Sequence, residues 1–259
     1  MDDAPEILPI PEAEPAESEP IRVSAGALVR DASLDLVIAF GSGGILIMVL
    51  GITLTVMGLD PGTLLTSGWG IATLLLCTQL PLLYRALRRR RRNREKHRPE
   101  LALFDGATSS AVVRGVLTGA ALTILSGIYT GILAKISGPD AVQNQIDFLK
   151  DMLDDRVAVG VLVFLIAVMA PICEEIFFRG VVFGSARAVG MSKTGVALSA
   201  VLFAIVHLIP ILAPFYAFFA VVMCWLYVRT GTLAAPMAAH MTMNGLACLG
   251  LLLQNNQVV

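Results

Sequence analysis

The sequence predicts an all-α fold, a polytopic membrane bundle of about seven transmembrane helices. Of its 259 residues, 56% are hydrophobic and only 15% are charged, and the mean hydropathy is +0.77. A soluble domain carries about 25% charged residues. The apolar residues gather in stretches of about 20, a length that crosses about 30 Å of hydrocarbon. The charged residues lie mostly between these stretches, as expected of a membrane protein.

The chain begins with an acidic, proline-rich segment, which we assign to residues 1–30. The first 20 residues contain seven acids, five prolines and no basic residue. A signal peptide needs a basic start and an apolar centre, so we do not expect one here. The composition is typical of a disordered, solvated tail.

The remaining chain divides into three parts. We predict an N-terminal transmembrane hairpin at 31–84, a basic cytoplasmic loop at 85–110 and a core of five spans at 111–259. The expected spans are 34–57, 69–84, 111–134, a fourth that starts at 157, 194–212, 215–228 and 233–253.

Basic residues predict the orientation. Nine of the nineteen lie between Arg85 and Arg98, including the run RRRRR at 88–92. Basic loops face the cytoplasm, so with seven spans the N-terminus is cytoplasmic as well. The short loops and small size favour a prokaryotic plasma (inner) membrane. An arginine run can also bind nucleic acid, but this one is flanked by spans, so membrane lipids are the expected partner and nucleic acid is not.

Polar residues inside spans are costly and usually mark function. The stretch PICEEIFFRG carries two acids and an arginine directly after an apolar run, and two of the three histidines fall in later spans. Three pairs have helical i, i+4 spacing, so the members of each pair share a face. The pairs are Glu175 with Arg179, Phe203 with His207, and His240 with Asn244.

The clusters are also expected at similar depth. With a rise of about 1.5 Å per residue, Glu174 lies about 20 Å from Arg187. On the same scale His207 lies about 21 Å from Lys193, and His240 about 16 Å from the basic residue that precedes its span. Taken separately, each cluster also fits a packing role: an interfacial ion pair, a packing histidine, or hydrogen bonding between helices. Their common depth favours a single site.

The residue types indicate an acyl hydrolase. Arg179, one turn from Glu175, can neutralise that carboxylate, which leaves Glu174 to activate a water as a general base. A neutral histidine can share the proton. His240 and Asn244 can supply donors for a developing oxyanion. A GxSxG elbow is absent from the sequence, so covalent serine chemistry is not expected.

Three motifs carry a family resemblance. EEIFFR (174–179) fits EExxxR, FAIVH (203–207) fits FxxxH, and HMTMN (240–244) fits HxxxN. In this order, on successive late spans, they resemble the CPBP family of type II CAAX prenyl proteases and bacteriocin-processing or immunity enzymes, also called the Abi family. The resemblance covers about residues 157–253.

The resemblance implies an intramembrane glutamic-type endopeptidase whose site lies in a cytoplasm-facing cavity. Its substrate would be a membrane-associated or lipid-modified, CAAX-like protein or peptide. Glu174 would be the base, His207 would help to activate the water, and His240 with Asn244 would form the oxyanion site. The residues implied to support them are Glu175, Arg179 and Phe203.

Several alternatives stay open. Glu174, His207 and His240 could form a zinc site, but no HExxH pair is present and Asn244 is a poor zinc ligand, so we expect no cofactor. A second interpretation is a non-catalytic membrane scaffold or bacteriocin-immunity protein that keeps the fold. A transporter would predict inverted repeats, and the sequence shows none. The oligomeric state is not predicted.

Overall fold

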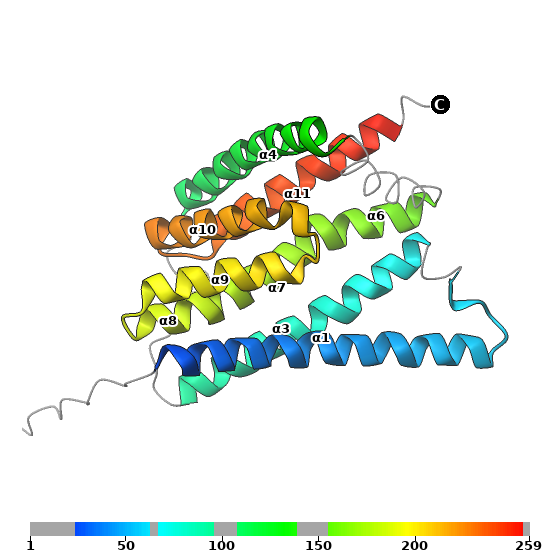
Figure 1. Cartoon of the computed structure of the whole chain (residues 1–259), viewed down its shortest axis with the longest axis horizontal. Coiled ribbons are helices and arrows are strands. Elements are labelled where there is room, and N and C mark those ends of the chain that lie inside the picture. The colour runs from blue at the N-terminus through cyan, green and yellow to red at the C-terminus, as the bar shows by residue number, and fades with distance from the viewer. Residues whose placement is uncertain (1–23, 63–66, 96–107, 139–154, 256–259) are drawn as a thin grey trace, which may run out of the picture.

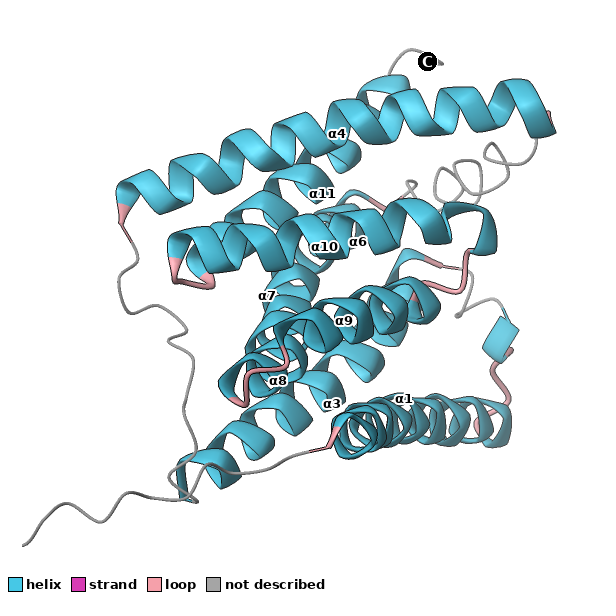
Figure 2. Ribbon diagram, turned by 60° about the vertical axis from the view of Figure 1, so that its left-hand side comes forward, coloured by secondary structure: helices cyan, strands magenta, loops and turns pink. Residues whose placement is uncertain are grey.

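The computed structural model describes residues 24–62, 67–95, 108–138 and 155–255, and in these ranges every regular element is a helix (Figures 1 and 2). The acidic tail lies almost entirely outside the described residues. The α-helices are α1 (Ala25–Val56), α3 (Gly68–Glu95), α4 (Ser109–Ser137), α6 (Arg156–Phe164), α7 (Ala170–Glu175), α8 (Gly184–Ala188), α9 (Ser192–Val206), α10 (Ala213–Thr230) and α11 (Ala234–Asn255). The π-helical segments are η1 (Leu165–Met169) and η2 (Ile176–Phe183), and the 3₁₀ turn is η3 (Pro210–Leu212).

Six helices in the described part of the chain are long and apolar enough to cross a membrane. They are α1, α3, α4, the continuous helix from α6 to α8 (Arg156–Ala188), α10 with its preceding turn, and α11. The seventh, α9, has only 15 residues. The predicted polytopic helical bundle is therefore confirmed, with six long helices and one short apolar helix where seven spans were expected.

Two helices extend beyond the predicted spans. Helix α1 begins at Ala25, where the Ser24 side chain accepts a hydrogen bond from the backbone N–H of Ala27 at 3.1 Å. Helix α3 continues to Glu95, so the arginine run is helical where a loop was expected. Arginine is a good helix former, and a buried carboxylate binds Arg85, which precedes the run, and Arg89 within it.

That carboxylate belongs to Asp35, which is buried on α1. Its Oδ1 accepts hydrogen bonds from Arg85, and its Oδ2 accepts one from Arg89 at 2.5 Å. A lone carboxylate in a span would be costly, so these arginines compensate Asp35 and clamp α1 to α3. The charged clamp includes Arg89 of the arginine run and lies outside the three motifs.

Helix α11 is fixed by close packing against α4. A Cβ atom on Gly115 would lie 2.3 Å from the carbonyl oxygen of Ala235, and one on Gly119 would lie 2.2 Å from that of Ala239. Glycines four residues apart allow such backbone contact between membrane helices. Ala239, the residue before His240, is therefore held directly against α4.

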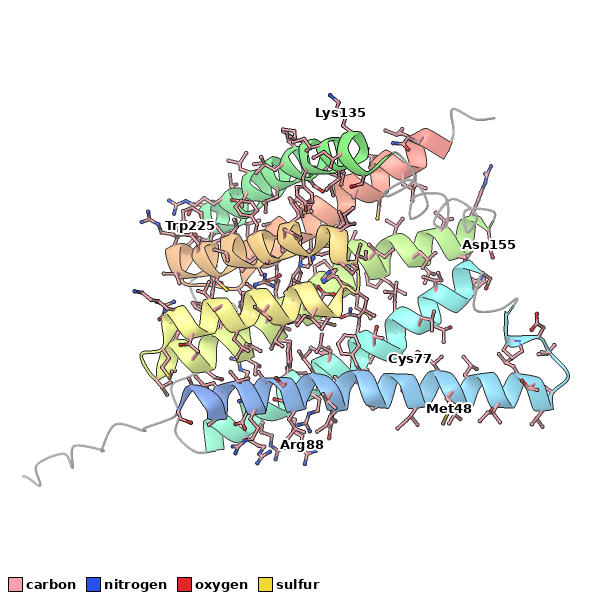
Figure 3. The ribbon with its side chains drawn as sticks, in the orientation of Figure 1. Met48, Cys77, Arg88, Lys135, Asp155 and Trp225 are labelled. Atoms are coloured by element: carbon pink, nitrogen blue, oxygen red, sulfur yellow. The ribbon has the colours of Figure 1, made fainter. Side chains whose placement is uncertain are left out.

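The two ends of the bundle can be identified by the residues that lie there. Arg88 and Trp225 lie toward one end, and Lys135 and Asp155 toward the other (Figure 3). We call the second the Lys135 end. The chain alternates between these ends from helix to helix (Figure 1).

Candidate active site

A cavity of about 650 Å³ lies among the helices. Residues of α1, α3, α4, η1, α7, η2, α9, α10 and α11 line it. Of the predicted site residues, Glu174, Phe203, His207, His240 and Asn244 line this cavity. The structure thus brings the four predicted catalytic residues together from α7, α11 and the end of α9.

The cavity extends from the middle of the bundle toward the Lys135 end. Its lining residues on α3, from Leu75 to Leu82, precede the arginine run, and those on α4 are Ser126 and Tyr129, near the end of that helix. The connection between α9 and α10 contributes Leu208 and Leu212. The cytoplasm-facing opening that the family resemblance implies stays a prediction.

Behind the cavity wall, Glu175 and Arg179 form the ion pair that their spacing predicts. Nη1 of Arg179 donates to Oε1 of Glu175 at 2.9 Å, and neither side chain is exposed. The guanidinium carbon lies 4.8 Å from the ring centre of Phe203, and the rings of Phe178 and Phe219 are within 6 Å. Aromatic faces attract a desolvated cation. Phe203 therefore packs its ring against the guanidinium of Arg179.

Glu175 has a second partner, because His240 reaches the same oxygen. Nδ1 of His240 lies 3.0 Å from Oε1 of Glu175 and donates to it, since an ionised carboxylate only accepts. In the neutral imidazole, Nε2 is then an acceptor. His240 can thus donate from Nε2 only as an imidazolium.

Glu174 points the other way, toward the cavity. Its Oε2 lies 4.0 Å from Nε2 of His240, too far for a direct hydrogen bond. Its Oε1 accepts a hydrogen bond from Nε2 of Gln79 at 3.0 Å. Gln79 lies on α3, 95 positions earlier, and none of the motifs contains it. The only sequence signal is an amide within the apolar run LLLCTQLPLLY.

The predicted span 194–212 placed His207 inside a helix, but in the structure His207 lies just after the end of one. Helix α9 ends at Val206, His207 caps it, and the next residue, Leu208, has a positive φ of 54°. Nδ1 of His207 donates to the carbonyl oxygen of Phe203 at 2.7 Å, which leaves Nε2 as the acceptor in the neutral ring. The ring stacks on Tyr216 with centroids 4.0 Å apart. The chain turns at Leu208, so the helix ends earlier than its apolar pattern predicts.

Asn244 holds α11 to the central helix. Its Nδ2 donates to the carbonyl oxygen of Ile166 at 2.9 Å. In η1 the N–H of Ala170 pairs with Leu165, and the residue five positions after Ile166 is Pro171, which has no N–H. Asn244 therefore satisfies a carbonyl that the π-helical segment and Pro171 leave without a helical donor. One N–H of its amide serves this contact.

The alternative zinc site would use Glu174, His207 and His240 as ligands. Within the described residues, no group of three histidine, cysteine, aspartate or glutamate side chains is arranged to hold a metal ion. Nδ1 of His240 is also committed to Glu175. Of the three residues, the geometry pairs only Glu174 with His240.

Comparison with known proteins identifies one family. Residues 156–246 match the protein-family model described as Rce1-like, type II CAAX prenyl endopeptidase Rce1-like. The matched segment contains all three motifs and leaves α1, α3 and α4 outside it. No curated protein and no solved structure matches the chain. The resemblance that the motifs indicated is thereby confirmed for this segment.

Proposed function

The chain carries, at residues 156–246, a segment of the Rce1-like family of type II CAAX prenyl endopeptidases, and on that premise we propose that it is an intramembrane endopeptidase. The family is a protease family, and six candidate spans identify an integral multi-pass membrane protein. Our proposal adds a mechanism in which Glu174 activates the attacking water. It also adds a substrate class.

The position of Glu174 carries this proposal. Two adjacent carboxylates in a span face opposite surroundings: Glu175 is buried with Arg179 and His240, whereas Glu174 faces a cavity. Among the described residues, no arginine or lysine forms an ion pair with Glu174, so its carboxylate is suited to take up a proton. Structural packing alone does not require the second acid.

The reaction that we propose begins with a water held between Glu174 and the histidines. Glu174 takes one proton from this water as the oxygen attacks the carbonyl carbon of the substrate. Nε2 of His207, an acceptor in the neutral ring, orients the water through its other hydrogen. The attack produces a tetrahedral centre with a negatively charged oxygen.

Two groups on α11 are placed to stabilise that oxygen. The second N–H of Asn244 is a neutral donor, and His240 donates from Nε2 as an imidazolium next to the carboxylate of Glu175. Such donors are worth most in a site from which water is excluded. Protonated Glu174 then gives its proton to the leaving nitrogen, so the peptide bond breaks and the carboxylate is regenerated.

The substrate that we propose is a membrane-associated protein or peptide, including a lipid-modified, CAAX-like C-terminus. The cavity is lined mainly by apolar side chains from the spans, together with a few polar groups such as Glu174, His240 and Asn244. Such a lining suits a segment that carries an apolar or lipidated side chain. We place the protein in a prokaryotic plasma membrane with a cytoplasmic N-terminus, as the basic residues indicate.

The experiment compares Glu174→Ala and His207→Ala, made separately, with the wild type. His97→Ala is the matched control, because His97 is the histidine outside the three motifs. Membrane-peptide termini are compared by proteomics in cells that express each variant. We expect the same new termini with wild type and His97→Ala and none with the other two. A cellular phenotype that survives both site variants in well-expressed protein would instead identify a scaffold or immunity protein.

A further inference from the structure

We propose that Gln79 is a positioning residue for the carboxylate of Glu174, so that the N-terminal hairpin completes the active site. The inference rests on the proposed function, because it gives Gln79 a part in the same reaction. Gln79 lies outside the segment that matches the family model, on a helix that the motifs do not include.

The contact is specific to one oxygen of the carboxylate. Nε2 of Gln79 donates to Oε1 of Glu174 at 3.0 Å, and Gln79 is 8% exposed at the cavity wall. This hydrogen bond restricts rotation of the carboxylate and leaves Oε2 as the oxygen that faces His240. A base must hold its accepting oxygen within hydrogen-bonding reach of the water it activates.

Fold stability does not explain an amide at this position. Oε1 of Gln79 is buried and has no hydrogen-bond partner in the described part of the chain. A buried polar atom without a partner raises the free energy of the folded state. A methionine has the same length without this cost, so stability alone would favour it. The amide is explained by the donor that it presents to Glu174.

Helix α3 is anchored on both sides of Gln79. At its start, the indole N–H of Trp69 donates to Asp155 at 2.8 Å, which ties α3 to the beginning of the central helix. Six residues after Gln79, Arg85 is bound to buried Asp35. The helix also contacts α6, α7 and η2 along its length. These contacts fix the position of Gln79 along the helix axis relative to Glu174.

The test is Gln79→Met in the full-length protein, assayed for peptidase kinetics and thermal stability. Thr73→Val is the matched control, because Thr73 lies on the same helix and its hydroxyl donates to the carbonyl of Trp69, four residues earlier. We expect kcat to fall about 10²-fold, as for a small misplacement of a catalytic group. KM should stay within about threefold, because substrate binding is retained. The unfolding temperature should be unchanged or higher.

A second measurement shows whether Gln79 acts through Glu174. In a Glu174→Gln background, Gln79→Met should cause no further loss, because the group that it positions is already disabled. An equal loss in both backgrounds would overturn the proposal, and so would an unchanged kcat in the single variant. A Gln79→Met protein that does not fold would also overturn it, because the amide would then serve the fold.

These outcomes separate the inference from the proposed function. A wild-type protein without peptidase activity would overturn the function itself. An active enzyme that Glu174→Gln inactivates and Gln79→Met leaves unchanged would overturn the inference alone.

Discussion

Arg179 and Glu175 form an ion pair of 2.9 Å in which neither side chain is exposed. Removing one partner of a buried pair leaves an uncompensated charge, which costs about 3–5 kcal/mol. We expect Arg179→Met to lower the free energy of unfolding by about this amount. Unfolding in detergent, followed by circular dichroism, measures it.

The matched variant for this prediction replaces both partners. Glu175→Gln with Arg179→Met removes both charges, so it should recover most of the stability that Arg179→Met loses. If the single variant is as stable as the wild type, the pair does not stabilise the bundle as we describe.

Asn244 is predicted to have two separable roles. Asn244→Leu leaves the Ile166 carbonyl without its donor, and hydrogen bonds between membrane helices are worth about 1–2 kcal/mol at most. Loss of an oxyanion donor lowers kcat about 10²–10³-fold. We therefore expect a small loss of stability and a much larger loss of kcat. A modest loss of both would indicate that Asn244 serves only to hold the helices together.

Gly119 should tolerate no side chain. A Cβ atom there would lie 2.2 Å from a backbone carbonyl of α11. We expect Gly119→Ala to destabilise the protein by about 1–3 kcal/mol, as overpacking does. Gly127→Ala on the same helix is the control, since nothing lies within 4 Å of its added Cβ atom. Equal thermal stabilities of the two variants would contradict the close contact between α4 and α11.

Asp155 should make stability depend on pH. The hydrogen bond from Trp69, followed by those from the backbone of Ala158 and Val157, holds the pKa of Asp155 below its ordinary value of 3.8. A depressed pKa contributes stability above the unfolded-state value, and this contribution is lost as the pH falls through the folded-state value. Trp69→Phe should therefore be less stable than wild type at pH 6, with the difference shrinking at pH 3. A difference in unfolding temperature that does not change with pH would count against this interpretation.

The bundle and the motif residues could be predicted because their signals are local. Apolar length predicts spans, and i, i+4 spacing predicts that Glu175 meets Arg179. The predicted span ran through the end of α9 because Ala204 to Leu212 is apolar apart from His207, although Pro210 is a sequence signal that a helix ends before it. The turn depends on backbone geometry at Leu208, which its apolar side chain does not indicate.

Contacts between distant helices could not be predicted either. Gln79 is one amide in an apolar run, and its partner is 95 positions away. The hydrogen bond from Asn244 to the Ile166 carbonyl depends on a π-helical segment, and no residue pattern in the sequence predicts that segment. Pro171 indicated only that a backbone hydrogen bond is missing in this region. The sequence therefore predicts which residues matter more readily than which atoms they contact.

The central claim is that Glu174 is the base of a metal-independent peptidase. Its most direct test is cleavage of a membrane-associated peptide by purified wild type and Glu174→Gln in a chelator, with and without added zinc. We predict that the wild type keeps full activity in the chelator, and that the variant, folded and of wild-type stability, loses at least about 10²-fold in kcat. Activity that the chelator removes and zinc restores, or a fully active Glu174→Gln, would contradict this claim.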